Sequence, residues 1–178
     1  MFHKIFVLTI LIVLNYACKT NKSKELTKEN NGIHQKDCLV TITNQTDDFL
    51  KNIDELQNYK WNAVTKKATI NLTNDEILTI TRGGCIHFLV AAEFQLAKSI
   101  NYEKDSTYIF DRVLWITKLI NDYKYSMLKD AIKSGAYKTV TNKHITTLVF
   151  TNEILKEKFY AITINGKENT FSISQFLE

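Results

Sequence analysis

The sequence places one pair of reactive side chains close together, in the segment Gly83-Gly84-Cys85-Ile86-His87. On a β-strand, residues two positions apart project from the same face about 7 Å apart, so the Cys85 thiol and the His87 imidazole would lie side by side. A cysteine next to a histidine base is an arrangement that enzymes use for acyl transfer. The same pair also occurs on strands by chance, and a catalytic role would require a free thiol at Cys85.

Other kinds of chemical site have less support. The histidines His34, His87 and His144 are widely separated, and no two of them share the spacing of metal ligands. Gly83-Gly84 is the only glycine pair, whereas a nucleotide site needs a strand, a loop of several glycines and a helix in succession. We therefore expect no metal, no cofactor and no catalytic residues, and we expect that the protein is not an enzyme.

The charge of the chain argues against a nucleic-acid partner. The formal net charge is +4, but six of the 23 basic residues and only two of the 19 acidic residues precede position 37. The rest of the chain holds 17 residues of each sign and is neutral. Proteins that bind nucleic acid draw much of their affinity from neutralising phosphates, so a neutral domain makes that class of partner unexpected.

The N-terminus has the pattern of an export signal. Lys4 is followed by ten residues, positions 5–14, of which only Thr9 is polar. Ten helical residues reach about 15 Å, roughly half of a hydrocarbon core, so this stretch is too short to span a membrane. A charged start, a short apolar stretch and a small residue before Cys18 are typical of a secretory signal.

The end of this segment, Leu-Asn-Tyr-Ala-Cys at positions 14–18, resembles the lipobox of bacterial lipoproteins. That resemblance covers the first 20 residues or so. It implies a signal peptide over residues 1–17 and acylation of Cys18, with palmitate or a similar fatty acid. An ordinary cleaved signal, or an uncleaved anchor with an incidental cysteine, is the alternative.

Residues 18–36 have the composition of a tether between a lipid and a domain. They are polar and rich in lysine, with almost no apolar residues, as expected of a solvated spacer. The remainder, residues 37–178, has the length and apolar content of a single folded domain. If Cys18 is acylated, Cys38 is the only partner left for Cys85 in an oxidising compartment, which favours a Cys38–Cys85 disulfide. A buried free thiol at Cys85 stays open as an alternative.

The apolar periodicity predicts the elements of this domain. The first half is expected to contain a strand at 39–43, a helix from Thr46 to near Tyr59, and strands at 68–72 and 77–81. Residues 73–76 read as a turn. The paired glycines would then form a tight hairpin that leads into a strand at 85–96, with a helix after Gly84 as the competing interpretation.

The second half is expected to begin with a long helix. Apolar residues recur with helical spacing from a cap at Asp105 or Ser106 to Ser134-Gly135, with a possible break near Asn121-Asp122. Strands follow at 145–151, 158–164 and 170–175, and a turn at Asn165-Gly166 would place Tyr160 opposite Phe171. The fold class is therefore α+β, with a mostly antiparallel sheet of about six strands packed with one short and one long helix.

Tyr59 and Trp61 lie just beyond the first predicted helix, where an exposed aromatic pair could anchor a protein partner. Together these features favour a bacterial envelope lipoprotein, held to a membrane by its lipid, with its domain in the periplasm or at the cell surface. We expect it to bind a protein of unknown identity without catalysis, as an immunity protein or enzyme inhibitor does. The alternatives are a structural or assembly component of the cell envelope and, less favoured, a hydrolase or transferase that uses Cys85 and His87.

Overall fold

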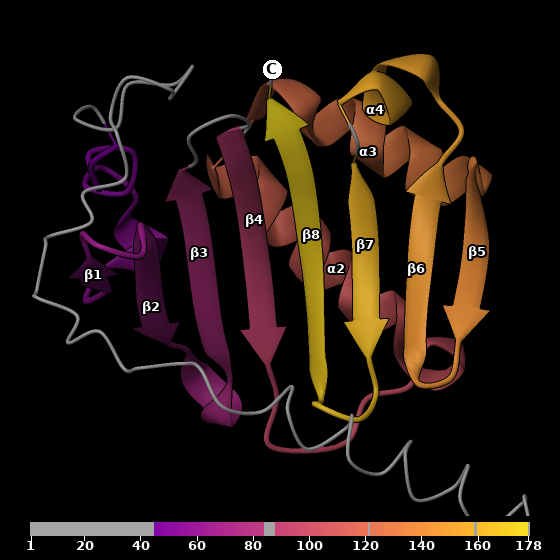
Figure 1. The fold of residues 1–178 in the computed structure, drawn as a ribbon, viewed down its shortest axis with the longest axis horizontal. Helices are drawn as coiled ribbons and strands as arrows, with labels where there is room; N and C mark the ends of the chain where they lie inside the picture. The colour runs from indigo at the N-terminus through magenta and orange to yellow at the C-terminus, as the bar shows by residue number, and fades with distance from the viewer. Residues whose placement is uncertain (1–44, 84–87, 121, 159, 178) are drawn as a thin grey trace, which may run out of the picture. The chain divides into compact units, whose positions relative to one another are not determined.

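An antiparallel sheet of eight strands runs through the part of the chain that the computed structural model describes, residues 45–83, 88–120, 122–158 and 160–177. The strands lie in the order β1-β2-β3-β4-β8-β7-β6-β5, and all neighbouring pairs are antiparallel (Figure 1). Their bounds are β1 Lys60–Asn62, β2 Lys67–Asn71, β3 Ile77–Gly83, β4 Phe88–Gln95, β5 Tyr137–Asn142, β6 Ile145–Phe150, β7 Ala161–Asn165 and β8 Thr170–Leu177.

The sheet consists of two four-stranded meanders that meet in its centre. The helices α2 (Tyr102–Ile120) and α3 (Asp122–Ser134) connect the first meander to the second, and β8 returns to pair with β4. Both helices lie on one side of the sheet, behind it in Figure 1. Shorter elements are the 3-10 turns η3 (Asp54–Leu56) and η4 (Thr73–Asp75) and the single-turn helix α4 (Glu153–Glu157).

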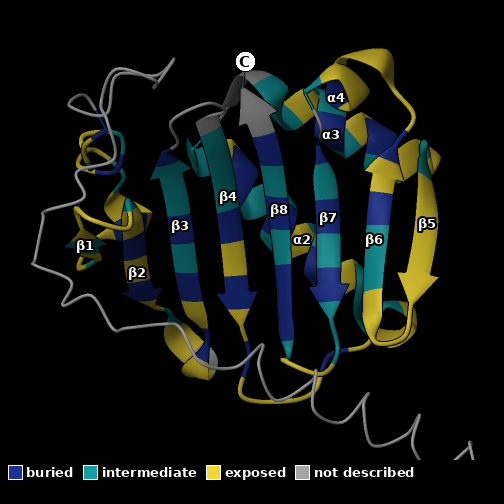
Figure 2. Cartoon of the chain, in the orientation of Figure 1, coloured by how far each residue is buried: buried dark blue, intermediate teal, exposed yellow. Residues whose placement is uncertain are grey.

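The core lies between the sheet and the two helices. Alternate residues of β2, β3, β4, β6, β7 and β8 are buried there, as the dark blue bands of Figure 2 show. At the junction of the meanders, Phe94 of β4 lies opposite Phe171 of β8, and the two rings stack with their centroids 4.8 Å apart. From the helix layer, α2 contributes Ile109, Val113 and Ile116, all with no exposed surface. The expected α+β class with antiparallel pairing is confirmed, with eight strands instead of about six.

The strand predicted after the glycine pair is confirmed, and the competing helix is wrong. Residues Phe88–Gln95 form β4, which pairs with β3 from Gly83↔Leu89 to Ile77↔Gln95. The period-two pattern decides the matter because Ala92 and Phe94 are buried while Glu93 and Gln95 are exposed. The connection itself, residues 84–87, lies outside the described residues, as does the strand predicted at 39–43.

The long helix starts earlier than expected and is divided in two. It begins at Tyr102 because Asn101 caps it: the Asn101 side chain accepts a hydrogen bond from the Glu103 N–H at 2.9 Å. The break predicted near Asn121-Asp122 is present, since α2 ends at Ile120 and α3 begins at Asp122. In α3, Leu128 is fully buried, whereas its neighbour Met127 is only partly buried. Gly135, with φ of 67°, ends α3 as predicted.

The helix predicted from Thr46 to Tyr59 is wrong. The segment consists of turns followed by η3, and Asn58 has a positive φ of 65° that no helix allows. The Thr46 and Asp48 side chains do bond locally, with Thr46 Oγ1 donating to Asp48 Oδ2 at 2.6 Å. Ser, Thr and Asp form such bonds in turns as readily as at helix starts, so the cap signal did not distinguish the two.

The predicted register of the last hairpin is also wrong. Phe171 lies opposite Ile164, not Tyr160, because the loop occupies residues 166–169 instead of Asn165-Gly166 alone. The Asn165 side chain accepts hydrogen bonds from the N–H groups of Lys167 (3.2 Å) and Glu168 (3.3 Å), and Asn169 takes a φ of 55°. Asn165 therefore initiates a longer turn in which Asn169 supplies the left-handed residue.

Candidate binding surface

The face of the sheet that points away from α2 and α3 is not covered by either helix (Figure 1). We call it the open face. It carries the strand residues that alternate with the buried ones. Across its middle, successive cross-strand partners are Thr79, Glu93, Ser172, Thr163 and Thr147. These are small hydroxyl residues and one glutamate, and such a polar face is the usual solvated side of an antiparallel sheet.

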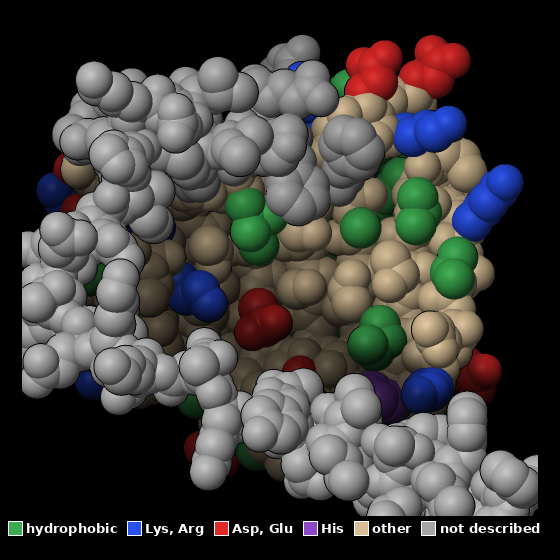
Figure 3. All heavy atoms as spheres, viewed as in Figure 1, with side chains coloured by type: hydrophobic (Ala, Val, Ile, Leu, Met, Phe, Trp, Pro, Cys, Tyr) green, Lys and Arg blue, Asp and Glu red, His purple; other side chains and the backbone are tan. Residues whose placement is uncertain are grey.

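One end of the open face carries apolar side chains instead. Val140 of β5 and Ile145 and Val149 of β6 are 59%, 38% and 43% exposed. Val149 lies opposite Ala161 of β7, so the apolar surface continues inward along the sheet. We call these four residues, Val140, Ile145, Val149 and Ala161, the β6 patch. Figure 3 shows several hydrophobic side chains, in green, on this face over β5 to β7, with other surface atoms between them.

A hollow of about 720 Å³ opens at one end of the β6 patch. Val149 and Ala161 contribute to its lining together with charged residues of α4. The helix is held there by Leu155, which is fully buried, and by its cap Asn152, whose side chain accepts from the N–H groups of Ile154 and Leu155. An apolar floor beside Glu153, Lys156 and Glu157 resembles the core and rim of a protein interface.

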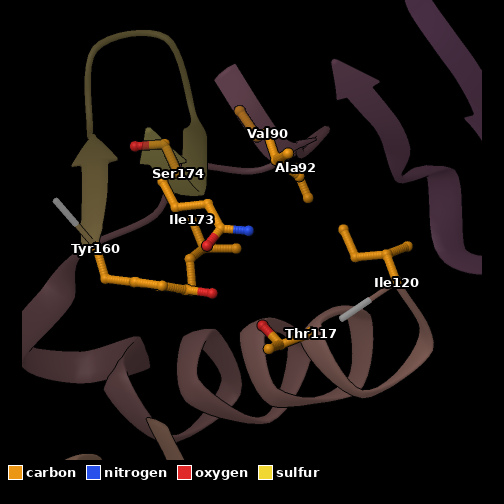
Figure 4. Close-up of a pocket in the computed structure, with 9 residues that line it drawn as sticks. Val90, Ala92, Thr117, Ile120, Tyr160, Ile173 and Ser174 are labelled. Atoms are coloured by element: carbon orange, nitrogen blue, oxygen red, sulfur yellow. The ribbon is translucent and has the colours of Figure 1, made fainter. Parts of the chain in front are cut away.

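The interface between the strands β4 and β8 and the end of α2 has no room for a ligand. Figure 4 shows Thr117 and Ile120 of α2 facing Val90 and Ala92 of β4 across a small cavity, with Ile173 of β8 beside them. Its volume is about 20 Å³, which corresponds to a single water molecule. This cavity is a packing defect and not a binding pocket.

A buried polar cluster joins the sheet to α2. Glu76, which is 6% exposed, accepts hydrogen bonds from the Tyr108 hydroxyl and from Arg112, whose Nε lies 3.0 Å from Glu76 Oε2. Burial and the bond to Glu76 raise the pKa of Tyr108 to about 12. Glu76 thus accepts three hydrogen bonds from Tyr108 and Arg112 and links the sheet to α2, and with Asp75 and Tyr108 it also lines a hollow of about 390 Å³. Within the described residues, no group of three His, Cys, Asp or Glu side chains could hold a metal ion.

The structure places Tyr59 and Trp61 against the domain. Both are half-buried and pack on the core. The Tyr59 hydroxyl donates to Asp47 Oδ2 at 2.9 Å, and the Trp61 ring meets Phe49 edge to face with centroids 6.3 Å apart. Their role in binding a partner stays a prediction. Cys18, Cys38, Cys85 and His87 lie outside the described residues.

Sequence reasoning did not find the β6 patch. In Ile145–Phe150, apolar and hydroxyl side chains occur on both faces of the strand, so no alternation distinguishes the exposed face from the buried one. The burial of Leu148 and Phe150 and the exposure of Ile145 and Val149 follow only from the position of the helices.

Comparison with known proteins gives no relative: no family model, no curated protein and no solved structure matches this chain. Among the described residues, no helix is both long enough and apolar enough to cross a membrane.

Proposed function

We propose that this chain is a bacterial envelope lipoprotein, anchored by an acylated Cys18, whose domain binds a protein and catalyses no reaction. The observation that carries the proposal is the β6 patch. Exposed apolar side chains grouped on one surface and bordered by polar residues are typical of protein interaction sites. The Glu76 cluster, in contrast, is engaged in hydrogen bonds and an ion pair that link the sheet to α2, so we assign it a structural role.

The surroundings of the β6 patch support a protein as its partner. Two of its members, Val149 and Ala161, form the floor of the hollow beside α4, whose Glu153, Lys156 and Glu157 supply charges at the margin. The Ser and Thr residues of the open face adjoin the patch on its other side. An apolar centre with a polar margin excludes water from the centre and fixes orientation at the margin.

The tether supports binding close to a membrane. Residues 18–36 would span on the order of 25 Å as a flexible coil, so the domain could reach partners near the bilayer surface. A lipid anchor with more than one acyl chain holds firmly enough to keep it there.

The proposal is tested by capture of partners from membranes with the full chain. The variant Val140→Glu/Val149→Glu places charges on the β6 patch, and Val64→Glu is the matched control, since Val64 is 91% exposed in the loop between β1 and β2. We expect the double variant to capture about 10-fold less of a partner protein than wild type, as for changes at an interface centre. Val64→Glu should capture as much as wild type. Equal capture by both variants would refute binding through this patch.

The state of the cells then distinguishes the kinds of partner. A stable complex in unperturbed cells would identify an assembly component of the envelope, whereas a partner found only after challenge would identify an inhibitor or immunity protein. Activity that depends on Cys85 and His87, with a free thiol found by titration, would replace both with the catalytic alternative.

A further inference from the structure

The strand β5 forms one end of the sheet, and it pairs only with β6 among the described elements. No other described segment lies along its outer side in Figure 1. All its residues after Tyr137 are exposed. The opposite end of the sheet differs, because β1 has only three residues. The outer edge of β5 is therefore the longer of the two edges available to another strand.

The ladder determines which backbone groups of β5 face outward. Thr151 donates its N–H to the Ala136 carbonyl at 2.9 Å, and the register pairs Lys138 with Val149 and Val140 with Thr147. In an antiparallel ladder, alternate residues direct their N–H and C=O groups at the partner strand. Lys138 and Val140 follow Ala136 at intervals of two, so their backbone N–H and C=O groups point toward β6. The backbone groups of Thr139 and Thr141 therefore point outward, away from the sheet.

Few features protect this edge. Sheets usually block strand addition with proline, a bulge, several charges or a very short edge strand. The edge strand β5 has no proline and runs in unbroken register for six residues. Its only charge is Lys138, and its middle, Thr139, Val140 and Thr141, is β-branched.

Charge and shape at this edge favour an acidic segment. Lys138 and Lys143 are both exposed, and positions 137–144 contain no acidic residue. A hollow of about 550 Å³ borders the strand on the helix side, lined by Thr139, Thr141 and Lys143 among others. Glu103 also borders that hollow. Lys138, Lys143 and Glu103 together carry a net charge of +1.

We propose that the outer edge of β5 binds an extended, acidic segment of a partner protein, which adds a ninth strand to the sheet. Thr139 and Thr141 supply the main-chain hydrogen bonds, Lys138 pairs with an acidic side chain on the open face, and the hollow beside Lys143 accepts a side chain from the helix side. The inference rests on the proposed protein-binding function and names the chemistry of the partner. A second copy of this chain fits less well, because pairing two β5 edges would bring four lysines together with no acid from either strand.

The test uses the full chain in detergent and a blocked, fluorescent eight-residue peptide of alternating valine and glutamate. A matched peptide carries lysine in place of glutamate. Fluorescence polarisation measures binding. We expect the glutamate peptide to bind at least 10-fold more tightly than the lysine peptide. Thr139→Pro should weaken binding at least 10-fold, since it removes an outward N–H and leaves the β6 ladder intact, whereas Thr139→Ala keeps that N–H and should bind within about two-fold of wild type.

Charge reversal tests the second half of the proposal. The double variant Lys138→Glu/Lys143→Glu should bind the glutamate peptide at least 10-fold more weakly than wild type. The control Lys60→Glu/Lys67→Glu, at the opposite end of the sheet, should bind it as wild type does. If Thr139→Pro fails to fold, two glutamate peptides replace it, one N-methylated at its odd positions and one at its even positions. Only the peptide whose methyl groups block the N–H groups facing β5 should fail to bind.

With the peptides, the inference would be overturned by no binding of the glutamate peptide, by equal binding of both peptides, or by a concentration-dependent dimer that prevents the peptide from binding. The proposed function is judged separately by capture from membranes. If Thr139→Pro loses the peptide but captures the membrane partner as wild type does, the β5 edge is not where that partner binds and the inference fails while protein binding stands. If wild type captures nothing, the proposed function fails whatever the peptide does.

Discussion

Glu76, directly before β3, and Arg112, in the middle of α2, form an ion pair between the sheet and the helix that covers it. The pair is largely buried, with 7% of the Glu76 side chain and 23% of the Arg112 side chain exposed. Arg112 also lies over the Trp115 ring, 5.0 Å from its centroid. The pair therefore fixes α2 against the first meander.

We expect Glu76→Ala to lower the free energy of unfolding by about 3 kcal/mol, because it leaves Arg112 and the Tyr108 hydroxyl without their acceptor. Glu76→Gln keeps one carbonyl oxygen and should cost less. Urea denaturation measures both. Asp48→Ala is the control, since its pair with Lys51 is exposed and should contribute little. A Glu76→Ala protein as stable as Asp48→Ala would show that the buried pair does not hold the layers together.

Alkaline pH should destabilise the fold through Tyr108. Burial and the bond to Glu76 raise its pKa to about 12, whereas an unfolded tyrosine has a pKa of about 10. Between these values the unfolded chain loses its proton first, so stability is intact below about pH 10 and falls as the pH rises toward 12. In Tyr108→Phe the free energy of unfolding should fall less steeply over that range. An unchanged slope, measured by urea denaturation at each pH, would contradict this assignment.

Much of the fold could be predicted from residues whose burial alternates. The strands β2 and β4 alternate between buried and exposed residues, with Ala68 and Ile70 buried in β2 and Ala92 and Phe94 buried in β4. This period-two pattern of apolar residues could be recognised in the sequence. The edge strand β5 was missed because its residues after Tyr137 are all exposed, and a strand without a buried face carries no such period.

The candidate surface could not be predicted for a related reason. Val149 and Leu148 are adjacent and similar in character, yet one is 43% exposed and the other fully buried. Only the position of α2 and α3 distinguishes them. From the sequence alone both residues would be assigned to the core, so the exposed β6 patch could not be recognised. The Glu76–Arg112 pair was missed because its members are 36 positions apart.

The disulfide predicted between Cys38 and Cys85 remains to be tested by peptide mapping of protein alkylated at lysis and kept non-reduced. One contact in the described part is compatible with it. Gln45 is buried against Gly83, where an added Cβ would lie 2.5 Å from Gln45 Oε1, so the chain that follows Cys38 approaches the strand that leads to Cys85. Reduction should lower stability by roughly 4 kcal/mol, for a closed loop of about 50 residues. Two alkylated cysteines would exclude the bridge.

Acylation of Cys18 predicts that wild type is labelled by a radioactive fatty acid in growing cells and sediments with membranes. In Cys18→Ser the label should be absent and the protein should be released, because the tether that follows is polar. Cys38→Ser is the matched control and should stay labelled. Label retained in Cys18→Ser would show that the anchor lies elsewhere.

Protein binding through the β6 patch is tested most directly by a photo-crosslinking amino acid placed in the living cell. The probe replaces Val149 in one strain and Val64 in another, since both valines are exposed and only Val149 belongs to the patch. We predict that irradiation gives a discrete, heavier covalent complex with one protein from Val149, and none from Val64. The absence of any complex from Val149, both in unperturbed and in challenged cells that contain the folded and membrane-bound protein, would contradict the account.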